Sequence, residues 1–272
     1  MTIKQLRSIC QSSALLTDPW YMRVVIRKIS IYFTAFFVKT KLTPNQITAL
    51  QIAAGLLAAI LLYFDNLITA ILVAILLNLS LVFDCSDGEL ARFKDHKTAA
   101  GLFLDGFNHI LISGLLYLSS GFYLSNILDG QLAALVGSLA AIFFSLPVTS
   151  TLRSSLITTV DRGNVMALAD FRSYFKKIEN QSRPEKANIF KNIKLINLMQ
   201  NPFKPPYNML IILALAIGNQ IFYHQLSLIW LTFISTTAIV YVLTNFLFLW
   251  YWLKNNEVVK LYFRLENKLK NK

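Results

Sequence analysis

Three aspartates lie near one another between two strongly apolar stretches of the chain, at Asp84, Asp87 and Asp105. On insertion scales a charged side chain at the centre of a spanning helix costs about 2.5 to 3.5 kcal/mol, and less near the interface. Clustered carboxylates also repel one another unless a cation lies between them. A divalent ion that prefers oxygen ligands, such as Mg²⁺, Mn²⁺ or Ca²⁺, would offset both costs.

Helical spacing arranges these residues in two stripes that can face each other. The first stripe is spaced i, i+3, i+4, i+7 and consists of Asp84, Asp87, Gly88 and Ala91. The second is spaced i, i+4, i+8 and consists of Gly101, Asp105 and His109. The glycines and the alanine remove bulk beside the carboxylates, which lets helices approach or leaves room for a ligand. Arg92 adds a planar guanidinium suited to a phosphate oxygen, and magnesium sites often combine carboxylates with substrate phosphates.

The elements that must carry these stripes are membrane helices. The 272 residues are 55% hydrophobic with a mean hydropathy of +0.52, which is more apolar material than one soluble core takes. A spanning helix needs about 20 mostly apolar residues. We therefore predict an all-α, polytopic membrane protein with six transmembrane helices, at 46–64, 67–84, 101–122, 131–152, 207–224 and 227–253.

The distribution of basic residues predicts the orientation. All 26 Lys and Arg residues fall on one side of the six-span arrangement, and the segments 65–66, 123–130 and 219–226 contain none. Because positive residues are retained in the cytoplasm, we expect both termini and the aspartates on the cytoplasmic side. The net charge of +12 then forms a one-sided layer whose partner is anionic membrane lipid and not nucleic acid.

The remaining segments suit the membrane surface. Arg23, Arg27 and Lys28 alternate with apolar and aromatic residues, the composition of an N-terminal interfacial helix. Thr43 and Pro44 fit the cap and first turn of the first span. The predicted organisation is an arm at 1–45, a membrane domain at 46–253 that includes a basic cytoplasmic loop at 153–206, and a basic cytoplasmic tail at 254–272.

At the two stripes the sequence resembles the CDP-alcohol phosphotransferase family, whose signature reads D-x-x-D-G-x-x-A-R, about eight residues, then G-x-x-x-D-x-x-x-D. Seven of the eight signature positions match at the family spacing: Asp84, Asp87, Gly88, Ala91, Arg92, Gly101 and Asp105. The last position departs, because this chain has His109 where the family has Asp. The segment TPNQIT, from Thr43 to Thr48, is also similar to the family's entry into the first span.

The resemblance implies a metal-dependent transferase of lipid or envelope biosynthesis. A CDP-alcohol donor and an alcohol acceptor, lipid alcohols included, would give a phosphodiester and CMP. One or two divalent ions, Mg²⁺ or Mn²⁺, would be held by Asp84, Asp87 and Asp105. The nucleotide would be surrounded by Gly88, Ala91, Arg92 and Gly101, and we expect the chain to form a homodimer.

Several alternatives stay open from the sequence. In the family the fourth Asp is a metal ligand and the proposed general base; His109 is either a catalytic base in that place or a polar residue without a catalytic role. Asn108 is a second candidate ligand. The lost Asp also suggests a catalytically inactive relative that binds nucleotide or lipid. A small cation transporter is disfavoured, because the carboxylates cluster at one membrane face and not at the midplane.

Overall fold

The computed structural model describes residues 2–12, 18–95, 99–128, 130–146 and 200–254. Within these ranges the chain is helical, with short turns and no strand. The predicted all-α fold is confirmed for this part of the protein. The predicted loop at 153–206 lies mostly outside the described residues, and the tail from 255 onward lies wholly outside them.

Four of the described helices are long and apolar enough to cross a membrane. They are α3 (Pro44–Leu61), α4 (Leu67–Phe93), α5 (Ala99–Ile127) and α11 (Ser227–Lys254). The helices α6 (Gln131–Ser145) and α10 (Tyr207–Ile221) are apolar but have 15 residues each. At 1.5 Å per residue this is about 22 Å, against about 30 Å for the hydrocarbon layer. Six spans therefore stay a prediction, and four are found at spanning length.

The helix α4 is longer than the second span predicted from hydropathy. That span ends at Asp84, whereas the helix continues to Phe93, as the helical spacing of the first stripe predicts. The aspartates of the first stripe thus lie within a continuous helix and not at its end. The hydropathy pattern stops at the first charge, whereas the residues that follow are good helix formers such as Glu89, Leu90 and Ala91.

The start of α3 follows the predicted capping pattern. The Thr43 hydroxyl accepts a hydrogen bond from the Gln46 backbone N at 3.3 Å, and the Gln46 side chain accepts one from the Thr43 backbone N at 2.9 Å. Pro44 occupies the first helical position, where its missing N–H costs nothing. This reciprocal cap fixes where α3 begins, one turn before residues that contact the aspartates.

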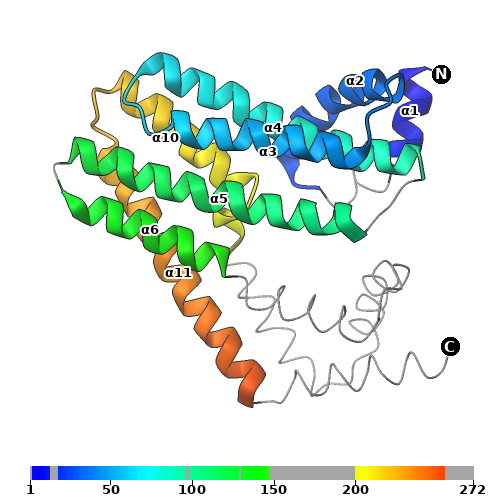
Figure 1. The fold of residues 1–272 in the computed structure, drawn as a ribbon. Coiled ribbons are helices and arrows are strands. Elements are labelled where there is room, and N and C mark those ends of the chain that lie inside the picture. Colours follow the sequence, from blue (N-terminus) through cyan, green and yellow to red (C-terminus); the bar gives the residue numbers. More distant parts are fainter. Residues whose placement is uncertain (1, 13–17, 96–98, 129, 147–199, 255–272) are drawn as a thin grey trace.

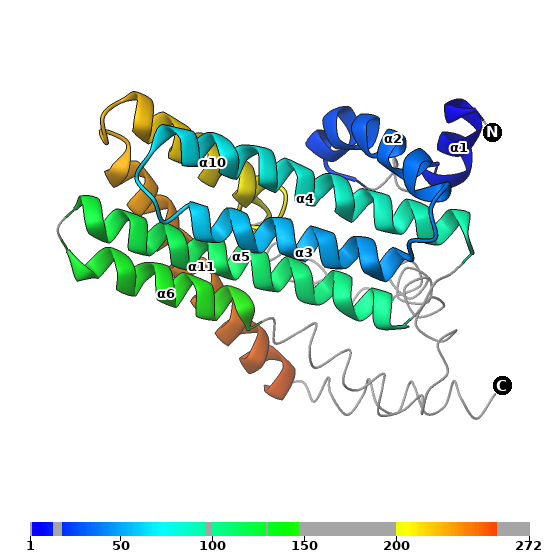
Figure 2. The same ribbon diagram turned by 45° about the horizontal axis from the view of Figure 1, so that its top comes forward.

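The long helices pack as a layer in which α3 lies between α4 and α5, and α6 lies beyond α5 (Figure 2). α5 and α6 approach with their backbones in contact: a Cβ added to Gly121 would lie 2.7 Å from the Gly137 Cα. On the α3 side, a Cβ at Gly55 would lie 2.1 Å from the Ile112 side chain. Small residues at such crossings let helices associate closely in a membrane. α10 packs on α4, and α11 packs on α6.

The N-terminal arm consists of α1 (Ile3–Cys10), a π-helical turn (Met22–Ile26) and α2 (Arg27–Val38). It packs against the end of α4 that carries the aspartates, as Figure 1 shows near the N-terminus. Its outer side exposes large side chains, including Trp20 (62%), Tyr32 (61%) and Phe36 (63%). The interfacial position of this helix stays a prediction. Arg27 departs from that prediction, because it is buried against α4 instead of facing headgroups.

Candidate active site

The two predicted stripes converge at one end of the helix layer. Asp84 comes from α4, whereas Asp105 and His109 come from α5, one helical turn apart. The His109 Nε2 lies 3.4 Å from the Asp84 Oδ1 and 3.4 Å from the Asp105 Oδ1. One potential ligand atom from each of the three residues lies within 4.8 Å of the others. This spacing suits ligands that share one metal ion.

Asp87 is not part of this group of three. It is almost fully buried, and its Oδ2 accepts a hydrogen bond from the Thr48 hydroxyl at 2.6 Å. Since Asp87 lies one turn along α4 from Asp84, it still belongs to the same face of the helix. The structure thus brings two of the three predicted metal ligands, Asp84 and Asp105, together with His109. The third, Asp87, is held one turn away by its hydrogen bond to Thr48 of α3.

Two side chains of α3 hold the α4 carboxylates in place. Thr48 binds Asp87, and the Gln51 Nε2 donates to the Asp84 Oδ1 at 2.8 Å. Hydrogen bonds of this kind orient a metal-ligating carboxylate. Our sequence reasoning noted Thr48 only as part of TPNQIT and missed Gln51. The available signal was their i, i+3 spacing just after the cap, which puts both polar groups on one face of an apolar helix.

The donor set fits a divalent cation. Asp84 and Asp105 both approach the same imidazole, and a cation between the two carboxylates would relieve their repulsion. Carboxylate oxygens suit Mg²⁺ and Mn²⁺, and an imidazole nitrogen is compatible with Mn²⁺ and later transition metals. The Gln51 Oε1, beside Asp84, is buried and without a hydrogen-bond partner in the described part of the chain. A polar ligand at this site would lie next to it.

The guanidinium of Arg92, predicted to contact a phosphate of the nucleotide, has another partner in the structure. It lies beside Gly88, where an added Cβ would be 3.4 Å from the Arg92 Nη1. However, the Arg92 Nε donates to the backbone carbonyl of Cys10 in the arm at 2.6 Å. Only the remaining nitrogens of the fork are therefore left for a phosphate. Gly101 lies one turn before Asp105, and Ala91 is half-buried on α4.

Asn108, the alternative ligand, is completely buried, and neither atom of its amide group has a hydrogen-bond partner among the described residues. Its neighbour His109 is the one that contacts Asp84 and Asp105. Of these two neighbours, His109 is therefore the one that lies next to both carboxylates.

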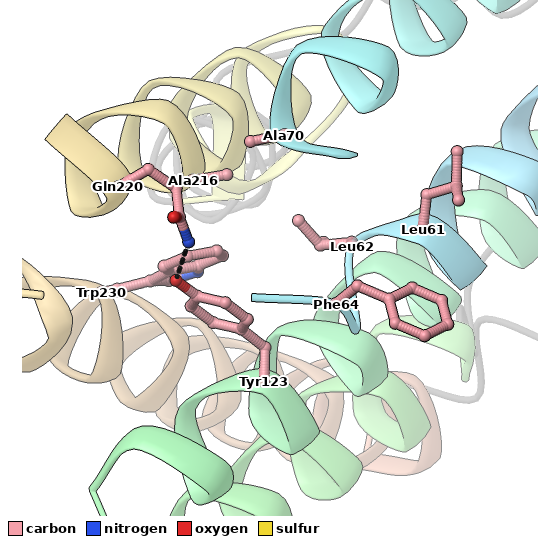
Figure 3. Close-up of a pocket in the computed structure, with 8 residues that line it drawn as sticks. All are labelled: Leu61, Leu62, Phe64, Ala70, Tyr123, Ala216, Gln220 and Trp230. Atoms are coloured by element: carbon pink, nitrogen blue, oxygen red, sulfur yellow. Dashed lines mark hydrogen bonds between the residues drawn. The ribbon is translucent and has the colours of Figure 1, made fainter. Parts of the chain in front are cut away.

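A small pocket lies at the opposite end of the helix layer (Figure 3). It is lined mainly by apolar side chains from the ends of α3, α5 and α10 and the beginnings of α4 and α11. Within it the Gln220 Nε2 donates to the Tyr123 hydroxyl at 3.1 Å. This pocket is far along the helices from the carboxylates and is not part of the candidate active site.

Comparison with known proteins confirms the family that the sequence resembles. A family model described as CDP-alcohol phosphatidyltransferase matches residues 41–261, a range that contains the signature residues and most of the helical layer. The chain is also similar to the "Bifunctional IPC transferase and DIPP synthase" of Aquifex aeolicus (strain VF5), with 35% identity over 88 residues. That match covers 32% of this chain and 19% of the relative, so the chain spans only a small part of it. On the extent of the family match, this chain belongs to the CDP-alcohol phosphatidyltransferase family.

Proposed function

We propose that this protein transfers a phospho-alcohol group from a CDP-alcohol to an acceptor alcohol and releases CMP, in the synthesis of phospholipids or related envelope lipids. The observation that carries the proposal is the meeting of Asp84, Asp105 and His109 from two helices within the range of the family match. The two carboxylates can hold a cation, and the imidazole of His109, left out of the metal's ligands, can accept a proton beside it.

In this proposal Asp84, Asp87 and Asp105 hold one or two divalent ions, Mg²⁺ or Mn²⁺. A bound ion would neutralise the diphosphate and the charge that develops as CMP leaves. The nucleotide lies along the small-residue face formed by Gly88, Ala91 and Gly101, with the free nitrogens of Arg92 toward a phosphate oxygen. Thr48 and Gln51 keep the α4 carboxylates directed toward the ion.

The test is metal-dependent release of CMP. Purified full-length protein, given a panel of CDP-alcohols with lipid and small polyol acceptors, is expected to release CMP with Mg²⁺ or Mn²⁺ and none in EDTA. The panel must be broad, because the similarity to a transferase and synthase covers 19% of that relative and assigns no substrate here. Nucleotide binding without CMP release from any donor would instead support the inactive relative, which the exchange to His109 suggests.

We further propose a multi-pass arrangement in which α6 and α10 complete six spans and both termini and the site are cytoplasmic. The one-sided basic residues and the exposed aromatic side chains of the arm support it. In a variant lacking Cys10 and Cys85, a cysteine at Asn66 is expected to react with an impermeant thiol reagent added outside. A cysteine at Asn188 is expected to react only after the membrane is opened. Labelling of position 188 from outside would contradict this topology.

The homodimer and the binding of anionic lipids also belong to this proposal. The face of the arm with Trp20, Tyr32 and Phe36, together with nearby basic residues such as Arg23 and Lys28, supports contact with an anionic membrane surface.

A further inference from the structure

A buried glutamate inside the signature segment has no role in the proposed chemistry. Glu89 follows Gly88 directly, and its side chain is completely shielded from solvent. Its carboxylate accepts four hydrogen bonds, three at 2.8 Å and one at 2.7 Å, from the Gln11 Nε2, the Arg27 Nη1, the Ser30 hydroxyl and the Thr34 hydroxyl. All four donors belong to the N-terminal arm or the turn that follows α1.

The network around Glu89 also connects the parts of the arm to one another. The Arg27 Nε pairs with the Asp18 Oδ2 at 2.8 Å, and the Gln11 Nε2 also donates to the Arg27 backbone carbonyl at 2.8 Å. A buried charge is tolerated only when it is paired and its remaining lone pairs are satisfied. The arm therefore docks on α4 in one geometry, the one that satisfies Glu89.

Glu89 lies on the side of α4 opposite the active-site aspartates. Successive helical residues are rotated by about 100°, so Glu89, two positions after Asp87, is turned by about 200° from it. The α3 side chains Thr48 and Gln51 contact the aspartate side of α4. The arm contacts the other side, where the Ser86 hydroxyl also donates to the Ser30 carbonyl at 3.3 Å. The carboxylate-bearing end of α4 is thus held between two partners.

We propose that Glu89 is a positioning residue that anchors the N-terminal arm through Arg27 and thereby fixes the rotation of α4, and with it the metal affinity of Asp84 and Asp87. The arm is then part of the catalytic unit. The inference rests on the proposed metal site. A purely structural ion pair would lower stability when broken but leave metal binding intact in any variant that folds well.

The experiment separates these roles with Arg27→Met, Glu89→Gln and the double variant, each as the full chain in detergent. Binding of Mn²⁺ alone is followed by the loss of the electron paramagnetic resonance signal of the free ion, and stability by the unfolding temperature. Arg27→Met is expected to be the least stable, because it leaves Glu89 charged and unpaired, and the double variant is expected to recover stability. Despite that recovery, the double variant should bind Mn²⁺ about 10- to 100-fold more weakly than the wild type, the usual effect of losing a partner that orients metal ligands.

The matched control is Asp65→Asn in the connection between α3 and α4, at the end of α4 opposite the aspartates. Asp65 also takes part in a side-chain network, with the Tyr123 hydroxyl at 3.2 Å and the His224 Nε2 at 3.4 Å, but it has no connection to the active site. It should lower stability without changing the affinity for Mn²⁺. If the stable double variant binds Mn²⁺ as the wild type does, Glu89 has no positioning role and only this inference fails. If the wild type itself binds no Mn²⁺, the proposed metal site fails and the inference falls with it.

Discussion

Asp84→Asn and Asp105→Asn are each expected to lower turnover by on the order of 10³-fold or more, while the protein still inserts and folds. Metal ions contribute several kcal/mol of transition-state stabilisation, and each 1.4 kcal/mol is about tenfold in rate. The two carboxylates come from different helices and approach the same imidazole, so neither replaces the other. Asp87→Asn should have a similar effect, because Asp87 lies one turn from Asp84 on the same face of α4. The measurement is CMP release together with Mn²⁺ binding by the purified variants.

The control for these variants is Asp95→Asn. Asp95 lies just beyond α4, is exposed and has a φ of 47°, a left-handed conformation that Asn accepts as readily as Asp. The same substitution there removes a carboxylate that is not part of the candidate site, so turnover should stay near that of the wild type. Full activity of the wild type in EDTA would rule out the metal mechanism.

The sequence was informative about features whose determinants are local. The cap at Thr43 and Pro44 depends on residues three positions apart, and the structure has it as predicted. The stripes of Asp84 and of Asp105 with His109 depend on helical spacing, and they converge because each helix carries its polar groups on one face. Hydropathy was a poorer guide to the end of α4. Hydropathy indicates where the chain passes from the hydrocarbon layer to water. A helix can continue past that boundary as long as its residues favour helix and its polar side chains find partners.

What the sequence could not provide was the identity of partners far apart in the chain. The sequence around Arg23, Arg27 and Lys28 is similarly apolar and aromatic, yet of these three only Arg27 is buried. It is buried because it pairs with Glu89, which is 62 residues away in the sequence. One local signal was present. Arg27, Ser30 and Thr34 are spaced i, i+3, i+7, a polar stripe on a largely apolar helix, and such a stripe indicates a buried polar partner. Its partner is identifiable only once the helices are placed.

The exchange of the fourth signature Asp for His109 leads to the second large expected effect. The His109 Nε2 faces both Asp84 and Asp105, so it also faces the place where the ion and the reacting groups must meet. The side chain of His109 is 35% exposed, which lets an acceptor hydroxyl approach the ring. We propose that His109 is the general base that takes the proton of this hydroxyl. The hydroxyl oxygen then attacks the phosphorus that carries the donor alcohol, and the bond from this phosphorus to the bridging oxygen breaks as CMP leaves. A positioned base contributes about 10²- to 10⁴-fold in rate.

His109→Ala and His109→Gln are therefore expected to lower turnover by about 10²- to 10⁴-fold, with little change in the binding of the CDP-alcohol. His109→Asp, which restores the family residue, is the matched variant and should keep most of the activity lost in His109→Gln. A base must be unprotonated to act, so turnover of the wild type should fall at acid pH, and this limb of the pH–rate profile should disappear in His109→Gln. Near wild-type turnover of His109→Gln would show that the proton passes to substrate or solvent, and that His109 serves only to hold Asp84 and Asp105 apart.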